Sequence, residues 1–104
     1  MLRVSVASLE YVRVRVRAKK QGVVYNPTVS DVEFAFTGKG GLTAQTVWVP
    51  GVWETDGADH YAMCLVGPGP NSAVELDTGN YKVWVRVVDN PEQPVKESGM
   101  LEVY

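Results

Sequence analysis

The stretch "ELDTGNYKVWVRVVDNP", residues 75–91, decides the fold class of this chain. From residue 81 onward its apolar residues recur at every second position, which is the period of a half-buried β-strand. The alternation places two sets of side chains on opposite faces: Tyr81, Val83, Val85 and Val87 inward, and Lys82, Trp84 and Arg86 outward. A tryptophan on an outward face is either covered by a neighbouring loop or anchors an interface. Both alternatives are open for Trp84.

The same period of two recurs along the chain. Strand-like segments occupy residues 2–7, 11–18, 32–36, 46–49, 60–66, 73–76, 81–88 and 100–104. The 10 glycines and 6 prolines lie mostly between them, and no segment repeats with the helical period of 3.6. The pattern predicts one all-β domain spanning residues 1–104, built as an antiparallel sandwich or barrel.

One local signature narrows this prediction. In "LDTGNYKV" a glycine-containing polar turn precedes Tyr81, the arrangement of a tyrosine corner, in which the hydroxyl returns to the backbone of that turn. Val83 stands where an antibody domain carries its second cysteine, and Phe34 and Phe36 occupy the region of the expected tryptophan. We therefore expect an immunoglobulin-like antiparallel β-sandwich of Greek-key topology that is not of the antibody type.

Composition and charge exclude several classes of protein. The net charge is −2, but residues 1–41 carry seven basic and three acidic groups, and the remainder carries three basic and nine acidic groups. This polarity favours electrostatic docking or self-association over nucleic-acid binding. A single cysteine excludes an internal disulfide, and no apolar run approaches the roughly 20 residues of a membrane helix. Because the alternating N-terminus does not resemble a signal peptide, we expect a soluble protein made in a cytoplasm.

Catalytic and metal sites find little support in the sequence. His60 and Cys64 share a strand face but would stand about 13 Å apart, too far for a nucleophile–base pair. Two acidic clusters are conceivable calcium ligands: Glu54, Asp56 and Asp59, and Asp89 with Glu92. Neither has a known ligand spacing, and both lie among turn-forming residues. We expect no enzyme activity, no cofactor and no metal.

Two surface features are candidate interfaces. Arg13, Arg15 and Arg17 form a stripe that either pairs with cross-strand acids such as Glu75 or docks on an acidic protein. The tryptophan candidates are Trp48, Trp53 and Trp84, where "WVPGVWET" either covers the outward face or presents its rings to a partner. Arg86 is expected between Glu33 and Glu102 in a charge ladder on the same sheet.

The C-terminal half resembles a known family. The run "WETDGADHYAMCLVGPG" followed by "LDTGNYKVWVRVVDNPEQPVKESGMLEVY" is similar to small immunoglobulin-like proteins encoded among the virion structural genes of tailed phages, especially those of actinobacteria. The earlier "GVVYNPTVSDVEFAF" resembles the family's turn and strand, and the N-terminal sandwich of phage baseplate proteins is more loosely similar.

The resemblance implies a non-enzymatic structural protein of the virion, with no catalytic residues to carry over. It implies a capsid-associated or decoration subunit, bound in many copies to the capsid protein or neighbouring head or tail subunits, as a homo-oligomer and without nucleic acid or membrane. The alternatives are a head–tail connector, a tail or baseplate component, and an immunoglobulin-like module that binds carbohydrate or a receptor.

Overall fold

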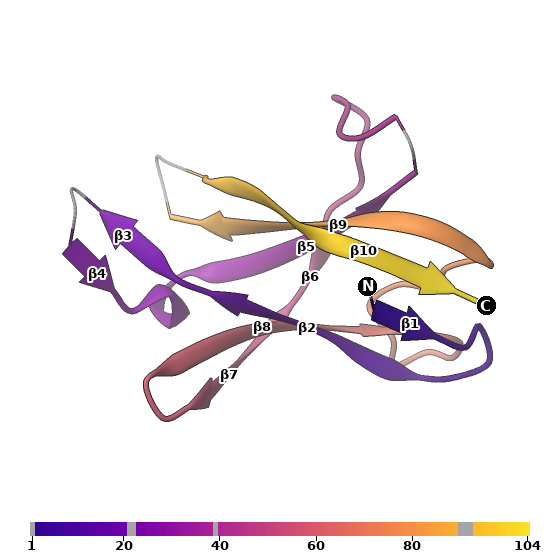
Figure 1. The fold of residues 1–104 in the computed structure, drawn as a ribbon, viewed down its shortest axis with the longest axis horizontal. Helices are drawn as coiled ribbons and strands as arrows, with labels where there is room; N and C mark the ends of the chain where they lie inside the picture. The colour runs from indigo at the N-terminus through magenta and orange to yellow at the C-terminus, as the bar shows by residue number, and fades with distance from the viewer. Residues whose placement is uncertain (1, 21–22, 39, 90–92) are drawn as a thin grey trace.

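The computed structural model describes residues 2–20, 23–38, 40–89 and 93–104, which form two facing β-sheets and a small additional hairpin (Figure 1). The described part contains no α-helix, only a 3-10 turn over Pro27–Val29. Asn26 caps this turn by accepting a hydrogen bond from the backbone N–H of Thr28 at 2.9 Å. No helix in these residues is long and apolar enough to cross a membrane. The all-β prediction is confirmed.

The larger sheet has five strands, of which β1 and β10 are parallel and the other neighbours antiparallel. Their spatial order is β1 (Leu2–Val4), β10 (Val95–Val103), β9 (Gly79–Val88), β5 (Asp31–Thr37) and β6 (Val49–Pro50). The long alternating strand of the sequence is therefore β9, at the centre of this sheet.

The smaller sheet has the order β2 (Glu10–Val16), β8 (Asp59–Val66) and β7 (Val52–Asp56). Asp56 pairs with Asp59, so the β7–β8 hairpin turns through two residues, and Gly57 takes the positive φ of 62° that such a turn requires. The separate hairpin pairs β3 (Ala18–Lys20) with β4 (Val23–Tyr25).

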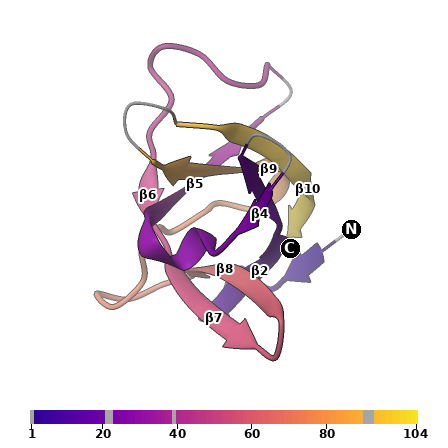
Figure 2. The same cartoon turned by 90° about the vertical axis from the view of Figure 1, so that its left-hand side faces the viewer.

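The chain crosses between the two sheets several times. It passes from β1 to β2, returns through β5 and β6, crosses again to β7 and β8, and ends with β9 and β10. Figure 2 shows β5 and β9 in one layer, with β2, β8 and β7 in the other. The core lies between these layers.

The inward residues of both sheets fill that core as the alternation predicts. On β9 the valines at 83, 85 and 87 are buried, whereas the residues between them are not. The other buried members of the core cluster are Val4, Val12, Val32, Phe34, Ala62, Cys64, Val66, Leu101 and Val103. Glycine is required where a loop touches this core: a Cβ on Gly51 would lie 2.8 Å from the Phe34 ring.

Three expected strand features differ in the structure. Val74 of "AVEL" makes only an isolated bridge to Val66, although it still packs on the core. In "TVWV" only Val49 is in a strand, because a turn that bonds the Thr46 N–H to the Thr43 carbonyl at 3.1 Å precedes it. β1 ends at residue 4, so Val6 is exposed rather than inward.

The tyrosine corner is present. Tyr81 packs against the core cluster, and its hydroxyl donates to the backbone carbonyl of Asp77 at 2.8 Å. Asp77 lies in the predicted "ELDTG" approach, so the hydrogen bond is confirmed. The side chain is half-buried rather than fully enclosed.

Candidate functional site

The arginine stripe lies on the outer face of the β2–β8–β7 sheet and is largely neutralised by the same sheet. The Arg13 guanidinium donates to a Glu54 carboxylate oxygen at 2.6 Å, and Arg15 donates to Asp59 at 2.7 Å. The expected pairing with cross-strand acids is confirmed, but Glu75 is not the partner. Asp59 lies on β8, the neighbour of β2, and Glu54 lies on β7, the next strand beyond β8 in the same sheet, whereas Glu75 lies outside the strands.

Aromatic and apolar side chains accompany these arginines. The Arg13 guanidinium carbon lies 3.6 Å from the centre of the Tyr61 ring, a cation–π contact. Tyr11 and Val52 are exposed on the same face, and Met63 beside them is half-buried. The face thus combines paired charges with partly open apolar surface, a mixture typical of protein interfaces.

Arg17 differs from the other two arginines. It is exposed at the end of β2, and in the part of the chain that the structure describes it makes no ion pair. The stripe therefore presents one unneutralised cation rather than three.

Arg86 lies on the outer face of the five-stranded sheet, on the opposite side of the molecule. Its Nε and Nη2 atoms donate to one Glu33 oxygen at 3.0 and 2.6 Å, and its guanidinium carbon lies 4.2 Å from the centre of the Trp48 ring. Glu33 and Arg86 are register partners on β5 and β9, so this half of the predicted charge ladder is confirmed.

The other half of the ladder, Glu102, is wrong. Glu102 pairs in register with Asn80, far along β9 from Arg86, and accepts a hydrogen bond from Arg3 at 2.6 Å. The hydrogen bond and charge of Glu102 raise the pKa of Arg3. The prediction failed because the register partner of Arg86 on β10 is Val95, seven residues before Glu102, and the register of two strands is not readable from alternation alone.

Trp84 is covered in part by its own chain. Its indole N–H donates to the Thr37 hydroxyl at 2.9 Å, and its register partner Ala35, on the same outer face, is 0% exposed. The connection from β5 to β6, which contains Trp48, extends on this outer side of the sheet (Figures 1 and 2). Both rings remain half-exposed.

Trp53 lies apart from the other two tryptophans. It is on the inner face of β7, packs against the core, and donates its indole N–H to the Ser30 carbonyl at 2.8 Å. Trp53 therefore neither covers the outward face of β9 nor presents its ring to a partner there. Trp53 follows the exposed Val52 directly, so the alternation of β7 points its side chain inward. This alternation is the sequence signal that distinguishes Trp53 from Trp48 and Trp84.

The only histidine and cysteine show no catalytic arrangement in the part of the chain described. Cys64 is buried, and desolvation raises the pKa of its thiol to about 12. A thiol with that pKa is protonated at neutral pH and is therefore a poor nucleophile. His60 Nδ1 lies 3.1 Å from the Thr55 hydroxyl.

Acidic side chains do not gather into a metal site among the described residues, which contain no group of three or more potential ligands. Glu54 and Asp59, from the first candidate calcium cluster, are instead bonded to arginines. Glu92, from the second, lies outside the described residues.

Comparison with protein-family models, with curated proteins and with solved structures gave no match.

Proposed function

We propose that this chain is an immunoglobulin-like domain with Greek-key topology, and the arrangement of its strands is the observation that carries the proposal. The sheet β2–β8–β7 corresponds to strands B, E and D of that fold, and β5, β9 and β10 correspond to C, F and G. β6 extends the second sheet as C′ does. The tyrosine corner at the start of β9 stands where the fold places it, near the start of strand F.

On this basis we propose a non-enzymatic structural role in the virion of a tailed phage, as a decoration subunit bound in many copies to the capsid. The residues that resemble phage virion proteins support it, and so does a domain whose two outer faces carry charged and aromatic side chains. The candidate contacts are Arg13, Arg15 and Arg17 on one face and Trp48, Trp84 and Arg86 on the other. The partner would be the capsid protein or a neighbouring head or tail subunit.

The position of Trp53 on the inner face of β7 removes it from the set of proposed contact residues. Because its ring packs on the core and its N–H is bonded to Ser30, we assign it to the domain's stability. A contact surface on the five-stranded sheet then depends on Trp48 and Trp84 alone.

A head–tail connector or a tail or baseplate component is the alternative within the same class. An immunoglobulin-like carbohydrate- or receptor-binding module is the alternative outside it, and the half-exposed Trp48 ring favours it. One face of that ring is engaged by Arg86, so a sugar would stack on the other face.

The test is the position of the protein in purified particles. We expect it to co-sediment with intact particles through a density gradient, and mass spectrometry of separated heads and tails to find it in the head fraction in many copies. Recovery only from soluble lysate would contradict the virion role, and recovery with tails would replace decoration by the tail alternative. Binding of the purified protein to a carbohydrate array would support the module.

A further inference from the structure

The seam between the two sheets is closed along one half and open along the other. β1 lies beside residues 101–103 of β10, and Val4 is buried there with Leu101 and Val12. Farther along β2, Val14 and Val16 belong to the same inward set as Val12, yet both are only half-buried. Figure 1 shows β1 beside the arrowhead of β10 only, and among the described residues no other strand pairs with β10 on this edge.

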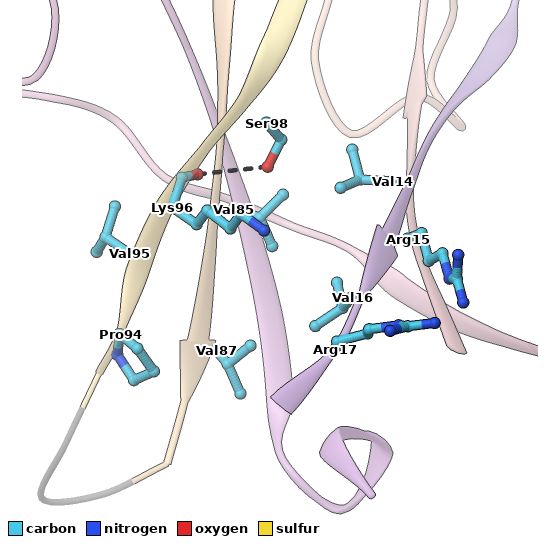
Figure 3. A pocket seen from close by; sticks show the side chains of 10 residues that line it. All are labelled: Val14, Arg15, Val16, Arg17, Val85, Val87, Pro94, Val95, Lys96 and Ser98. Carbon is cyan, nitrogen blue, oxygen red and sulfur yellow. Dashed lines mark hydrogen bonds between the residues drawn. The ribbon is translucent and has the colours of Figure 1, made fainter. Parts of the chain in front are cut away.

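A groove of about 170 Å³ occupies the open half. Its floor is formed by Val14 and Val16 from one sheet and by Val85 and Val87 from the other (Figure 3). This volume is more than ten times the roughly 10–15 Å³ that a single water needs. A second hollow, lined in part by Leu2, continues the groove to the end of β1.

Both walls of the groove are edges of strands. In the described chain β2 pairs only with β8, and residues 95–99 of β10 pair only with β9. Their outer backbone N–H and C=O groups are therefore available to a further strand. A segment continuing the line of β1 would pair with β10 and place every second side chain on the valine floor.

The rim of the groove carries positive charge. Arg15, Arg17 and Lys96 line it over the valine floor, where none of the lining residues is acidic, and Glu97 lines only the second hollow. Arg15 is paired with Asp59, whereas Arg17 and Lys96 make no ion pair in the part of the chain described.

The Lys96 side chain is exposed to solvent and lies on the seam side of β10. It lies opposite the inward Val85 in the register, and Figure 3 shows its side chain reaching across the groove. Glu97, the next residue, lies opposite Trp84 and so belongs to the outer face. An inward lysine on a sheet edge discourages a purely apolar strand, but an acidic side chain would neutralise it.

We propose that this groove binds an extended segment of a partner polypeptide as an added β-strand. The segment is apolar at alternate positions, which face the valine floor, except that one of these inward positions carries an acidic residue that pairs with Lys96. The charge of the rim selects this partner over a purely apolar strand. The inference does not depend on a place in the virion.

The experiment titrates the full-length protein with a seven-residue peptide, acetylated and amidated, that begins and ends with threonine, alternates threonine with valine, and carries aspartate in place of the central valine. Isothermal titration measures affinity, and amide hydrogen exchange reports which backbone groups become protected. We expect binding with protection confined to residues 13–17 and 95–99. A peptide with lysine in place of aspartate should bind about fivefold more weakly, which is the size of one lost exposed ion pair.

Protein variants and a modified peptide separate strand addition from other binding. Lys96→Ala should weaken the aspartate peptide about fivefold, and Lys82→Ala, on the outer face of β9, should not. Val16→Lys should abolish binding, with thermal unfolding confirming that the variant folds. A peptide with alternate backbone nitrogens methylated cannot pair with an edge and should not bind.

The proposal would be overturned if the methylated peptide bound as tightly as the aspartate peptide. It would also be overturned if the aspartate peptide did not bind at millimolar concentration. Concentration-dependent dimerisation that protects residues 95–99 would also overturn it, because the occupant would then be a second copy of this chain.

Discussion

At the scale of single residues, Trp84 shows what alternation determines and what it does not. Its parity places it on the outer face of β9, and the structure confirms that face. Its surroundings come from Thr37, which is 47 residues away in the sequence, and from the connection after β5. Side-chain direction follows from the local period of two, whereas the covering of a side chain depends on a loop whose path has no periodic signal.

Tyr81→Phe removes the hydroxyl that bonds to the Asp77 carbonyl. We expect the free energy of unfolding to fall by about 1 kcal/mol, the typical net contribution of one hydrogen bond. Urea denaturation measures it, with Tyr11→Phe as the control, because Tyr11 is exposed and its hydroxyl has no hydrogen bond within the described chain. Equal stability of the two variants would mean that the corner does not anchor the start of β9.

Cys64 gives a pH-dependent prediction. Burial raises the pKa of its thiol from 9.0 to about 12, so the folded protein keeps the proton over a range in which the unfolded chain loses it. The stabilisation is complete below about pH 9 and is lost as the pH rises toward 12. The stability advantage of the native protein over Cys64→Ala should therefore shrink across this range. An advantage that stays constant with pH would show that the thiol does not resist ionisation.

At the scale of elements, the strands with two clear faces were predictable and the weakly patterned ones were not. β5, β9 and the C-terminal end of β10 follow the expected alternation, because each buries one face against the other sheet. The segment 73–76 has the pattern without the strand. Its approach contains Pro68 and Pro70, which have no backbone N–H to pair, and it makes one bridge only.

The ion pair between Glu33 on β5 and Arg86 on β9 should stabilise the sheet more than a fully exposed ion pair does. The two side chains are 30% and 24% exposed, and Arg86 also stacks on Trp48. We expect Arg86→Ala to lower the free energy of unfolding by about 1–2 kcal/mol, because it leaves a half-buried carboxylate without its partner.

The matched control is Arg3→Ala. Arg3 also pairs at 2.6 Å with a carboxylate, Glu102, but is 62% exposed. Its loss should have the smaller effect, because solvent and salt screen an exposed pair. The same effect from both variants would indicate that burial at Arg86 does not strengthen its pair.

At the scale of the whole molecule, the charge asymmetry has a different meaning from the one the sequence suggests. Three basic residues of the first half pair with acids of the second half inside the same domain: Arg3 with Glu102, Arg13 with Glu54, and Arg15 with Asp59. Much of the charge difference between the two halves is therefore neutralised by ion pairs inside the domain. Sequence reasoning offered pairing with acids as one alternative but named Glu75, because the partners depend on which strands are neighbours, and neighbour order is a property of topology.

The proposed contact faces lie on opposite sides of the sandwich, one on each sheet, and this makes them separable. Contact through Arg13, Arg15 and Arg17 should weaken with added salt, because exposed charges are screened over about 8 Å at physiological ionic strength. Contact through Trp48 and Trp84 should resist salt, because burial of apolar surface is not screened. A subunit that uses both faces can link two neighbours and so build a repeating array.

The last prediction concerns binding of the purified protein to particles that lack it. Replacing Arg13, Arg15 and Arg17 together by neutral residues should weaken the salt-sensitive part of this binding. The free energy of unfolding should change little, since exposed ion pairs contribute at most about 1 kcal/mol each. Trp48→Ala or Trp84→Ala should weaken the salt-resistant part by about 2 kcal/mol if that ring is an anchor.

Acrylamide quenching of tryptophan fluorescence, in free and particle-bound protein, reports whether a half-exposed ring becomes protected. Trp53→Phe removes the signal of the core ring without changing either outer face, and so serves as the background for both measurements. If quenching of Trp48 and Trp84 is the same in the free and bound protein, the five-stranded face stays open to water in the particle. The arginine face would then carry the contact alone, and salt should release the protein completely.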